Sequence, residues 1–199
     1  TGLIVDCIHY VSPPYTSERA RMKVEALCEK LTDWCGNIVF YCVPFTELQE
    51  ALRDNCPEEL FTVLMRRLMV KIANRICAAN DYGAIITGES VAQVASQTLP
   101  AIFCTNAAAE YPVFRPVIGM DKREIVDIAR HIDTFEVSTL PYEDCCTVFS
   151  PKHPKTRPSL EEILAAEASF DFEPLIEKAV RETEVKQFKY GVRNVDLDM

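Results

Sequence analysis

The feature that most constrains the fold is the alternation of short apolar runs with longer amphipathic segments. The apolar runs are rich in β-branched residues and span residues 3–11, 37–45, 83–88 and 112–118. Helical patterns occupy residues 16–35, 46–53, 57–79, 120–132, 159–168 and 173–183, and one or two further helices are expected in 89–109, broken near Pro100. This alternation predicts an α/β fold, in which a parallel sheet is covered by helices on both faces.

Length and charge set limits on the class of protein. A chain of 199 residues fits one compact domain, or at most one and a half. It contains no run of about 18 apolar residues that would cross a bilayer, and no charged-then-apolar leader opens it, so we expect a cytoplasmic protein without a membrane. The formal net charge of -9 predicts a poor stand-alone binder of nucleic acid, because lysine and arginine contacts to phosphate dominate such affinity.

Nine cysteines are distributed unevenly between apolar and polar contexts. We expect four of them to be small buried hydrophobic residues: Cys7, Cys28, Cys42 and Cys77. No CxxC pair occurs, which argues against the usual zinc and iron–sulfur spacings. The adjacent pair Cys145–Cys146 alone has a polar setting in which both thiols are expected to be accessible.

In a parallel sheet, ligands collect at the carboxyl ends of the strands. The predicted strand ends include His9–Tyr10 and 87–89. Gly88 ends a buried strand, and we expect a helix to begin directly after it, which would direct backbone N–H groups at an anion. Polar residues follow at helical spacing, namely Ser90, Gln93, Ser96 and Gln97. A capped surface helix is an equally good interpretation of the same pattern.

Single charged residues in this sequence allow both structural and functional interpretations. Arg66 and Arg67 lie on a helix that is apolar nearly all round, so each either extends its charge to solvent or meets an anion. His9 at a strand end is more often structural than catalytic.

The stretch LPYEDCCTVFSPKHPKTRP, residues 140–158, is predicted to be a loop. A basic run follows the two thiols and contains Lys152, His153, Lys155 and Arg157. Its positive charge would lower a thiol pKa or hold an RNA backbone, whereas Glu143 and Asp144 act against both effects. Thiol chemistry and a purely structural role are equally supported by these residues alone.

Several motifs together resemble the tRNA uracil 4-sulfurtransferases, also called tRNA 4-thiouridine synthetases or thiamine-biosynthesis sulfur-transfer proteins. The motifs are HYVSPPYTSERA, LMRRLMVKIA, ITGESVAQVASQT, FRPVIGMDKREIVDIAR and LPYEDCCTVFSPKHPKTRP. The resemblance implies an adenine nucleotide α-hydrolase-like (ATP-pyrophosphatase) fold over residues 1–191, with 192–199 as a tail. It is closest to the shorter form of the family, which lacks a C-terminal rhodanese domain.

The chemistry that this resemblance implies is ATP-dependent. ATP, with Mg²⁺ as its counter-ion, adenylates O4 of a uridine in tRNA, and persulfide sulfur from a cysteine desulfurase then replaces AMP at C4. A sulfur-donor role towards a carrier protein in thiamine thiazole synthesis and a homodimer are further expectations. The resemblance implies no bound redox cofactor and no metal ligand set.

The resemblance also assigns roles to individual residues. It implies ATP contacts for His9, Tyr10, Arg66, Gly88, Gln97 and, in the Asp121–Lys122 pair, Lys122. Cys146 aligns best with the sulfur-carrying cysteine. Cys145 is then a second thiol and a candidate to resolve the persulfide, with a partner thiol elsewhere as the alternative because a vicinal disulfide is strained. Lys152, Lys155 and Arg157 are weaker candidates for RNA contact.

One departure from the family pattern leaves alternatives open. The phosphate-binding loop Ser-Gly-Gly-x-Asp-Ser is absent, as are the first strand and the RNA-binding THUMP module. We therefore expect this chain to be a C-terminal fragment that does not adenylate by itself. Three alternatives remain: a sulfur carrier without ATP chemistry, a position-2 tRNA thiolase of the same superfamily, and a non-catalytic interaction domain.

Overall fold

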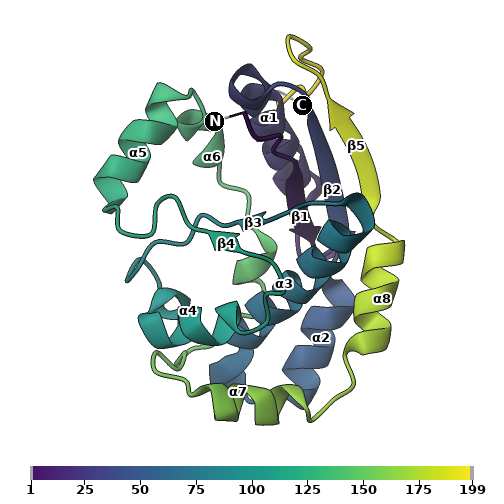
Figure 1. The fold of residues 1–199 in the computed structure, drawn as a ribbon, viewed down its shortest axis with the longest axis vertical. Helices are drawn as coiled ribbons and strands as arrows, with labels where there is room; N and C mark the ends of the chain where they lie inside the picture. Colours follow the sequence, from purple (N-terminus) through teal and green to yellow (C-terminus); the bar gives the residue numbers. More distant parts are fainter. Residues whose placement is uncertain (1, 198–199) are drawn as a thin grey trace. The chain divides into compact units, whose positions relative to one another are not determined.

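The computed structural model describes residues 2–197, and Figure 1 labels its helices and strands. The chain divides into two compact units. Unit 1 comprises residues 1–44, 122–148 and 182–199. Unit 2 comprises residues 45–121 and 149–181. The predicted tail at 192–199 belongs to unit 1, and its last two residues lie outside the described part of the chain.

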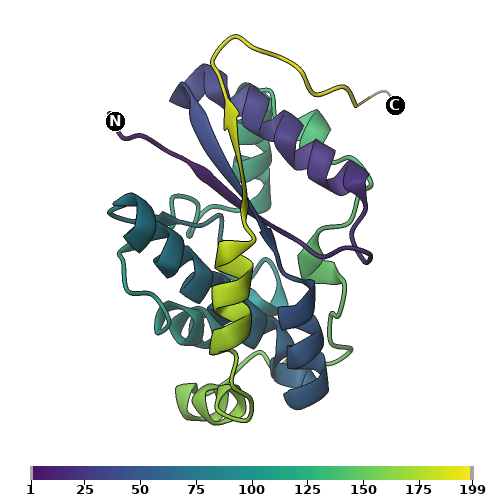
Figure 2. The ribbon, with the colours of Figure 1, turned by 90° about the vertical axis from the view of Figure 1, so that its right-hand side faces the viewer.

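Unit 1 contains a three-stranded sheet in the order β1–β2–β5. Its strands are β1 (Cys7–Val11), β2 (Ile38–Pro44) and β5 (Glu184–Phe188). β1 runs parallel to β2, and β5 runs antiparallel along the other edge of β2, as Figure 2 shows for the yellow strand. β2 is central and buried along most of its length, in agreement with its continuous apolar sequence.

Helix α1 (Glu18–Cys35) packs against this sheet. The side chain of Ser17 accepts a hydrogen bond from the Ala20 N–H, so Ser17 is the residue that caps the helix. Unit 1 also contains α5 (Lys122–His131), α6 (Phe135–Ser138) and the short 3₁₀ helix η3 (Cys145–Thr147). One apolar cluster joins α1 to the sheet and consists of Cys28, Ile38, Phe40, Cys42 and Phe188.

Unit 2 consists mainly of helices and contains a two-stranded parallel sheet. The strands are β3 (Ile85–Ile86) and β4 (Val113–Phe114). The helices are α2 (Thr46–Asn55), η1 (Glu58–Leu60), α3 (Phe61–Asn80), η2 (Ala95–Gln97), α4 (Leu99–Asn106), α7 (Leu160–Glu167) and α8 (Glu173–Arg181).

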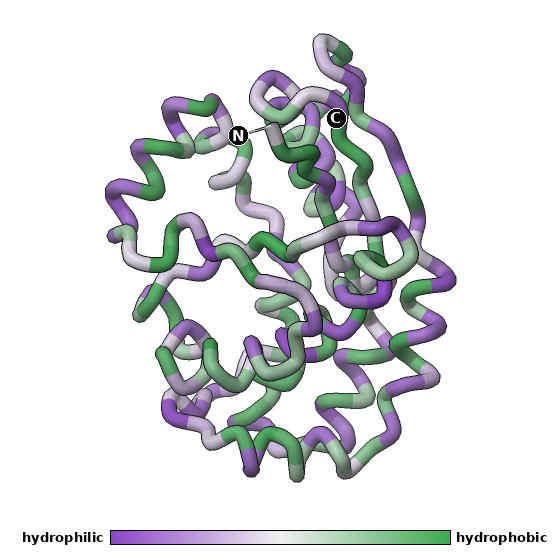
Figure 3. The backbone as a smooth tube through the Cα atoms, in the orientation of Figure 1, coloured by the Kyte–Doolittle hydropathy of each residue, from purple (hydrophilic) through white to green (hydrophobic). Residues whose placement is uncertain are grey.

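Helix α3 forms the centre of unit 2 and contacts α2, α4, α7 and α8. Its residues Leu64, Met65, Leu68 and Ile72 are almost completely buried. Helices α2 and α8 are amphipathic, and the alternation of hydrophilic and hydrophobic residues along α8 is visible in Figure 3. A second apolar cluster, Ala73, Cys77 and Ile85, connects α3 to β3 and so fixes the strand whose end leads to Gly88.

The structure corrects the prediction for residues 89–109. No helix begins after Gly88: residues 89–94 are not helical, and Ala92 has a positive φ of 66°. Pro100 lies in the first turn of α4, where a missing N–H costs nothing, so it begins a helix where we expected it to break one. The predicted anion site at a helix N-terminus after Gly88 is therefore wrong. Within residues 2–197, no helix is long and apolar enough to cross a membrane.

Candidate functional site

The two adjacent thiols of unit 1 have different environments. Cys145 and Cys146 open the 3₁₀ turn η3, which the Thr147 N–H closes by donating to the Asp144 carbonyl at 3.1 Å. Cys145 is only 5% exposed, whereas Cys146 is exposed. Neither forms a disulfide bond. The expectation that both thiols are accessible is therefore correct only for Cys146.

A buried lysine holds the loop that enters this turn. The Lys23 ammonium, on α1, donates to the Tyr142 carbonyl at 2.7 Å and lies 3.3 Å from the Asp144 carboxylate. The Arg19 guanidinium lies 6.0 Å from the centre of the Tyr142 ring. The sequence analysis did not identify Lys23, because a lysine on an amphipathic helix normally indicates an exposed face.

His9 on β1 interacts electrostatically with Lys23 and Asp144. Its ring stacks on Phe40 of β2 with centroids 6.2 Å apart. Burial lowers the pKa of His9 to about 4, so the imidazole is neutral at neutral pH; Asp144 acts to raise this pKa and Lys23 to lower it. Unit 1 thus pairs Lys23 with Asp144 directly before the two thiols, within electrostatic range of His9. Tyr10 follows His9 on β1 and faces the opposite side of the strand.

Unit 2 holds a second polar site where β3 and β4 end. The Glu89 carboxylate is buried and accepts from the Arg66 guanidinium at 2.9 Å, the Arg115 guanidinium at 2.7 Å and the Thr87 hydroxyl at 3.0 Å. Arg115 also donates to the Asn106 side chain at 3.1 Å. Two arginines share one carboxylate, so the cluster carries a net positive charge suited to a phosphate. From the sequence, Glu89 was named only as part of the strand end 87–89, and Arg115, inside the predicted strand 112–118, was not identified as a site residue.

Two polar atoms of unit 2 are buried without a hydrogen-bond partner among residues 2–197. They are Nε of Arg66 and Oε1 of Gln97, and both residues were predicted to contact ATP. Buried polar atoms are nearly always paired, so these atoms fit a polar ligand. A Cβ atom added to Gly88 would meet no atom within 4 Å, which means that the glycine leaves open space at the end of β3.

The other predicted site residues are placed as follows. Lys122 is exposed at the start of α5 in unit 1. Lys152, Lys155 and Arg157 lie in unit 2, where the Lys155 ammonium pairs with Glu162. The side chains of Lys152 and Arg157 are exposed.

The remaining cysteines behave largely as predicted. Cys28, Cys42 and Cys77 are buried, and Cys7 is half-buried. Burial raises the pKa of Cys42 to about 11, which makes it an unreactive thiol. Cys35 at the end of α1 is exposed, which the sequence analysis did not anticipate. The described residues contain no group of three or more His, Cys, Asp or Glu that could hold a metal ion.

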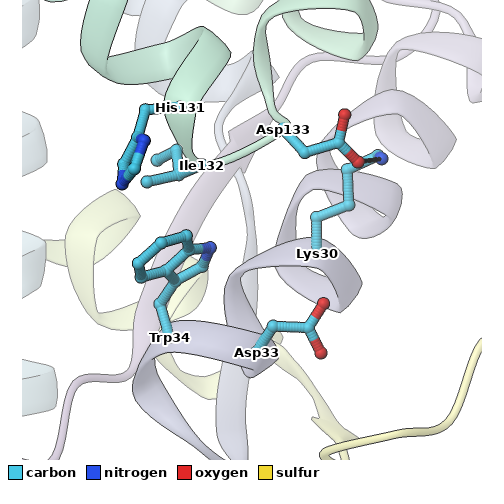
Figure 4. A pocket seen from close by; sticks show the side chains of 6 residues that line it. All are labelled: Lys30, Asp33, Trp34, His131, Ile132 and Asp133. Atoms are coloured by element: carbon cyan, nitrogen blue, oxygen red, sulfur yellow. Dashed lines mark hydrogen bonds and ion pairs between the residues drawn. The ribbon is translucent and has the colours of Figure 1, made fainter.

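A separate hollow of about 260 Å³ lies in unit 1 between α1 and the end of α5 (Figure 4). Its lining is Lys30, Asp33, Trp34, His131, Ile132 and Asp133. The rings of Trp34 and His131 are tilted by 49° to each other, with centroids 5.6 Å apart. Its charged side chains are already paired, Lys30 with Asp133 and Asp33 with Arg193, so the hollow offers no free charge to a ligand.

Comparison with known proteins identifies the family. A model of the family described as "Thiamine biosynthesis protein (ThiI)" matches residues 1–172. The chain belongs to the ThiI family. The resemblance noted from the motifs is therefore confirmed over most of the chain.

Individual relatives agree with this assignment. A probable tRNA sulfurtransferase of Acetivibrio thermocellus is 52% identical over 184 residues, which are 92% of this chain and 47% of the relative. One of Caldanaerobacter subterraneus subsp. tengcongensis is 50% identical over 88% of this chain and 46% of the relative. The chain thus spans about half the length of the curated relatives it matches.

A solved structure confirms the predicted fold class. A crystal structure of a 4-thiouridine synthetase–RNA complex with bound ATP is 34% identical in sequence and superimposes with a TM-score of 0.89. The match covers 94% of this chain and 50% of that chain. The α/β fold expected from the alternating pattern and from the motifs is therefore correct.

Proposed function

We propose that this chain carries the sulfur-transfer site of an ATP-dependent tRNA uracil 4-sulfurtransferase. The observation that carries the proposal is the pair of adjacent thiols, one buried and one exposed, directly after Asp144 in a chain of the ThiI family. A solvent-exposed thiol can receive sulfur from one protein and present it to an RNA base, whereas a buried thiol cannot.

The first proposed step is activation of the base. O4 of a uridine attacks the α-phosphorus of ATP, pyrophosphate leaves, and the adenylated oxygen becomes a good leaving group. His9, Tyr10, Arg66, Gly88, Gln97 and Lys122 are the proposed nucleotide contacts, with Mg²⁺ as the counter-ion of the phosphates. The unpaired Nε of Arg66 and Oε1 of Gln97 support this assignment, because each offers a polar group to a nucleotide.

The second proposed step is sulfur transfer from Cys146. The terminal sulfur of a Cys146 persulfide attacks C4 of the base, a C–S bond forms, and AMP leaves with the C4–O bond electrons. A second thiolate then attacks the Cys146 sulfur and displaces 4-thiouridine, which leaves a disulfide that a dithiol reductant must reduce. Cys145 is the neighbouring candidate for this thiolate, but its burial and the strain of a vicinal disulfide favour a thiol from elsewhere.

The partners follow from this chemistry. We propose tRNA as the substrate and a cysteine desulfurase as the persulfide donor, in the cytoplasm. A sulfur-donor role towards a thiazole-synthesis carrier protein and assembly as a homodimer are the finer expectations of the family resemblance. The relatives are about twice as long as this chain, and we propose that residues outside the matched half of those relatives also contribute to adenylation.

The main alternative is a sulfur carrier without ATP chemistry. It needs the exposed Cys146 but gives no role to the arginine cluster around Glu89, which the ATP-dependent function uses. A position-2 thiolase of the same superfamily is less favoured because the chain has no CxxC pair.

The test is to locate sulfane sulfur after incubation with a cysteine desulfurase and cysteine, by mass spectrometry of the intact chain and its peptides. We expect sulfur on Cys146, lost in Cys146→Ala and retained in Cys145→Ala. Cys35→Ala is the matched control, because Cys35 is the other exposed thiol of unit 1 outside the site. Equal loading of Cys35 and Cys146, or no loading of Cys146, contradicts the proposal.

A further inference from the structure

We propose that Lys23 is a positioning residue that determines which of the two adjacent thiols is presented to solvent. Its contacts to Tyr142 and Asp144 orient the chain entering η3, so that Cys145 faces inward and Cys146 outward. This inference deepens the proposed function, on which its catalytic meaning rests, whereas the orientation of the thiols can be measured independently.

The first support is the burial of the lysine itself. The Lys23 side chain is only 6% exposed, and a buried ammonium is costly unless it is paired and hydrogen-bonded. Both of its partners come from the segment directly before the thiols: the Tyr142 carbonyl at 2.7 Å and the Asp144 carboxylate at 3.3 Å. The contact therefore stabilises one conformation of this loop on α1.

The second support is the rigidity of the element that carries Lys23. Cys28, five residues further along α1, is part of the apolar cluster that joins the helix to β2. The Ser17 cap fixes the start of the helix six residues before Lys23. A charge on such an element is a fixed point, and a loop bonded to it takes up a defined position.

The third support is the geometry of the turn. Successive side chains of a 3₁₀ helix are separated by about 120°, so Cys145 and Cys146 cannot face the same way. Rotation of the turn about its own axis would exchange their exposures. Because Asp144 is the N-cap of η3, its contact to Lys23 sets this rotation directly.

The contact of Arg19 with the same loop differs in kind. Its guanidinium lies 6.0 Å from the centre of the Tyr142 ring and 3.5 Å from the Tyr142 hydroxyl, and Arg19 is exposed. An exposed contact to a side-chain tip leaves the backbone orientation free. Arg19→Met is therefore a matched control for Lys23→Met, since it removes a neighbouring positive charge from the same helix.

The experiment measures alkylation of each cysteine in the 199-residue chain by N-ethylmaleimide, with peptide mass spectrometry. In the wild type we expect Cys146 to react much faster than Cys145. In Lys23→Met the ratio of the Cys146 to the Cys145 rate should fall by about tenfold or more, because the loop opens locally. Lys23→Arg should restore part of the ratio, and Arg19→Met should leave it unchanged.

Cys42 serves as the internal reporter of global unfolding, because it is buried in the sheet and only 3% exposed. An unchanged Cys146 to Cys145 ratio in Lys23→Met, with Cys42 still protected, overturns the proposal. If Lys23→Met exposes Cys42, Asp144→Ala decides: a fall of the ratio of a few-fold supports the proposal and an unchanged ratio overturns it.

Failure of this inference is distinguishable from failure of the proposed function. If the alkylation ratio falls as expected but the wild-type Cys146 takes up no sulfane sulfur, Lys23 positions the thiol and the sulfur-carrying role is wrong. If Cys146 takes up sulfur and Lys23→Met leaves both the ratio and the site of loading unchanged, the function stands and the role of Lys23 is wrong.

Discussion

The Cys146 loop of unit 1 and the Glu89 cluster of unit 2 use charge in opposite ways. In unit 1 a buried cation, Lys23, meets a carbonyl and the largely exposed carboxylate of Asp144. In unit 2 a buried anion, Glu89, is enclosed by Arg66, Arg115 and the Thr87 hydroxyl. The first arrangement presents an exposed thiol, whereas the second fixes two guanidinium groups.

This difference matches the two tasks in the proposed function. A nucleotide site must hold its donors in place before the ligand arrives, because preorganised charges stabilise a transition state without reorganising. A sulfur-carrying thiol must be reachable from two partners in turn, so a loop tied at one point suits it better than an enclosed cluster. Variants that alter one site and leave the other intact test whether the two sites are independent.

The largest expected effect is the loss of the anion in unit 2. Glu89→Ala leaves two partly buried arginines with no carboxylate between them, and removal of one partner of a buried ion pair costs about 3–5 kcal/mol. Denaturant unfolding followed by circular dichroism should show this loss. Glu173→Ala is the control, because its pair with Arg75 is half-exposed and should contribute about 0–1 kcal/mol.

Two outcomes would show that the two sites are less different than we propose. The first is a Glu89→Ala variant that loses no more stability than Glu173→Ala, which would mean that water or other groups satisfy the arginines. The second is a Glu89→Ala variant in which the alkylation rate of Cys146 also changes. The change in that rate, converted to a free energy, would have to equal the loss of unfolding free energy, and the stability of the Glu89 cluster would then affect the Cys146 thiol.

The next largest effect is the pH dependence that His9 gives to unit 1. The ordinary histidine pKa is 6.5, and burial lowers that of His9 to about 4 in the folded chain. Between these values the unfolded chain binds more protons than the folded chain, so stability falls as pH falls from 6.5 to 4. The loss is at most about 3 kcal/mol. His9→Phe keeps a ring on Phe40 and should remove this part of the pH dependence.

The single tryptophan makes this measurement specific to unit 1. Trp34 lies at the end of α1, and its fluorescence follows the unfolding of the unit that contains His9. The informative quantity is the difference between wild type and His9→Phe, since carboxylates also titrate in this range. Parallel pH curves for the two proteins would rule out the buried neutral imidazole.

The sequence predicted elements best where local signals and tertiary contacts agree. Strands β1 and β2 carry continuous apolar runs. Helices were predicted in 16–35 and 159–168, and Ser17 and Ser159 cap them, Ser159 through a reciprocal capping box with Glu162. The sequence failed where short signals are ambiguous. β5 has a mixed polar pattern typical of an edge strand, and it was not predicted.

The residue types of the candidate site could be predicted from the sequence, whereas the burial and contacts of those residues could not. The motifs pointed to the two cysteines. Adjacent residues share the same sequence neighbours, so no local sequence signal indicated that Cys145 is buried and Cys146 exposed. Lys23 was missed because its partners lie 119 residues or more further along the chain. Contacts at such separation are set by the fold and leave no local pattern.

The smallest expected effect concerns the basic run that follows the thiols in sequence. The side chains of Lys152 and Arg157 are exposed, whereas the Lys155 ammonium is held by Glu162. If the run contacts RNA phosphate, Lys152→Ala and Arg157→Ala should each lower the slope of log affinity against log salt by about 1, and Lys155→Ala should change it less. Anisotropy of labelled tRNA at low salt measures this slope, since the net charge of -9 opposes binding at higher salt.

Equal effects of all three variants would mean that Glu162 releases Lys155 when RNA binds. No effect of any variant would confine the proposed RNA contacts to residues outside the run.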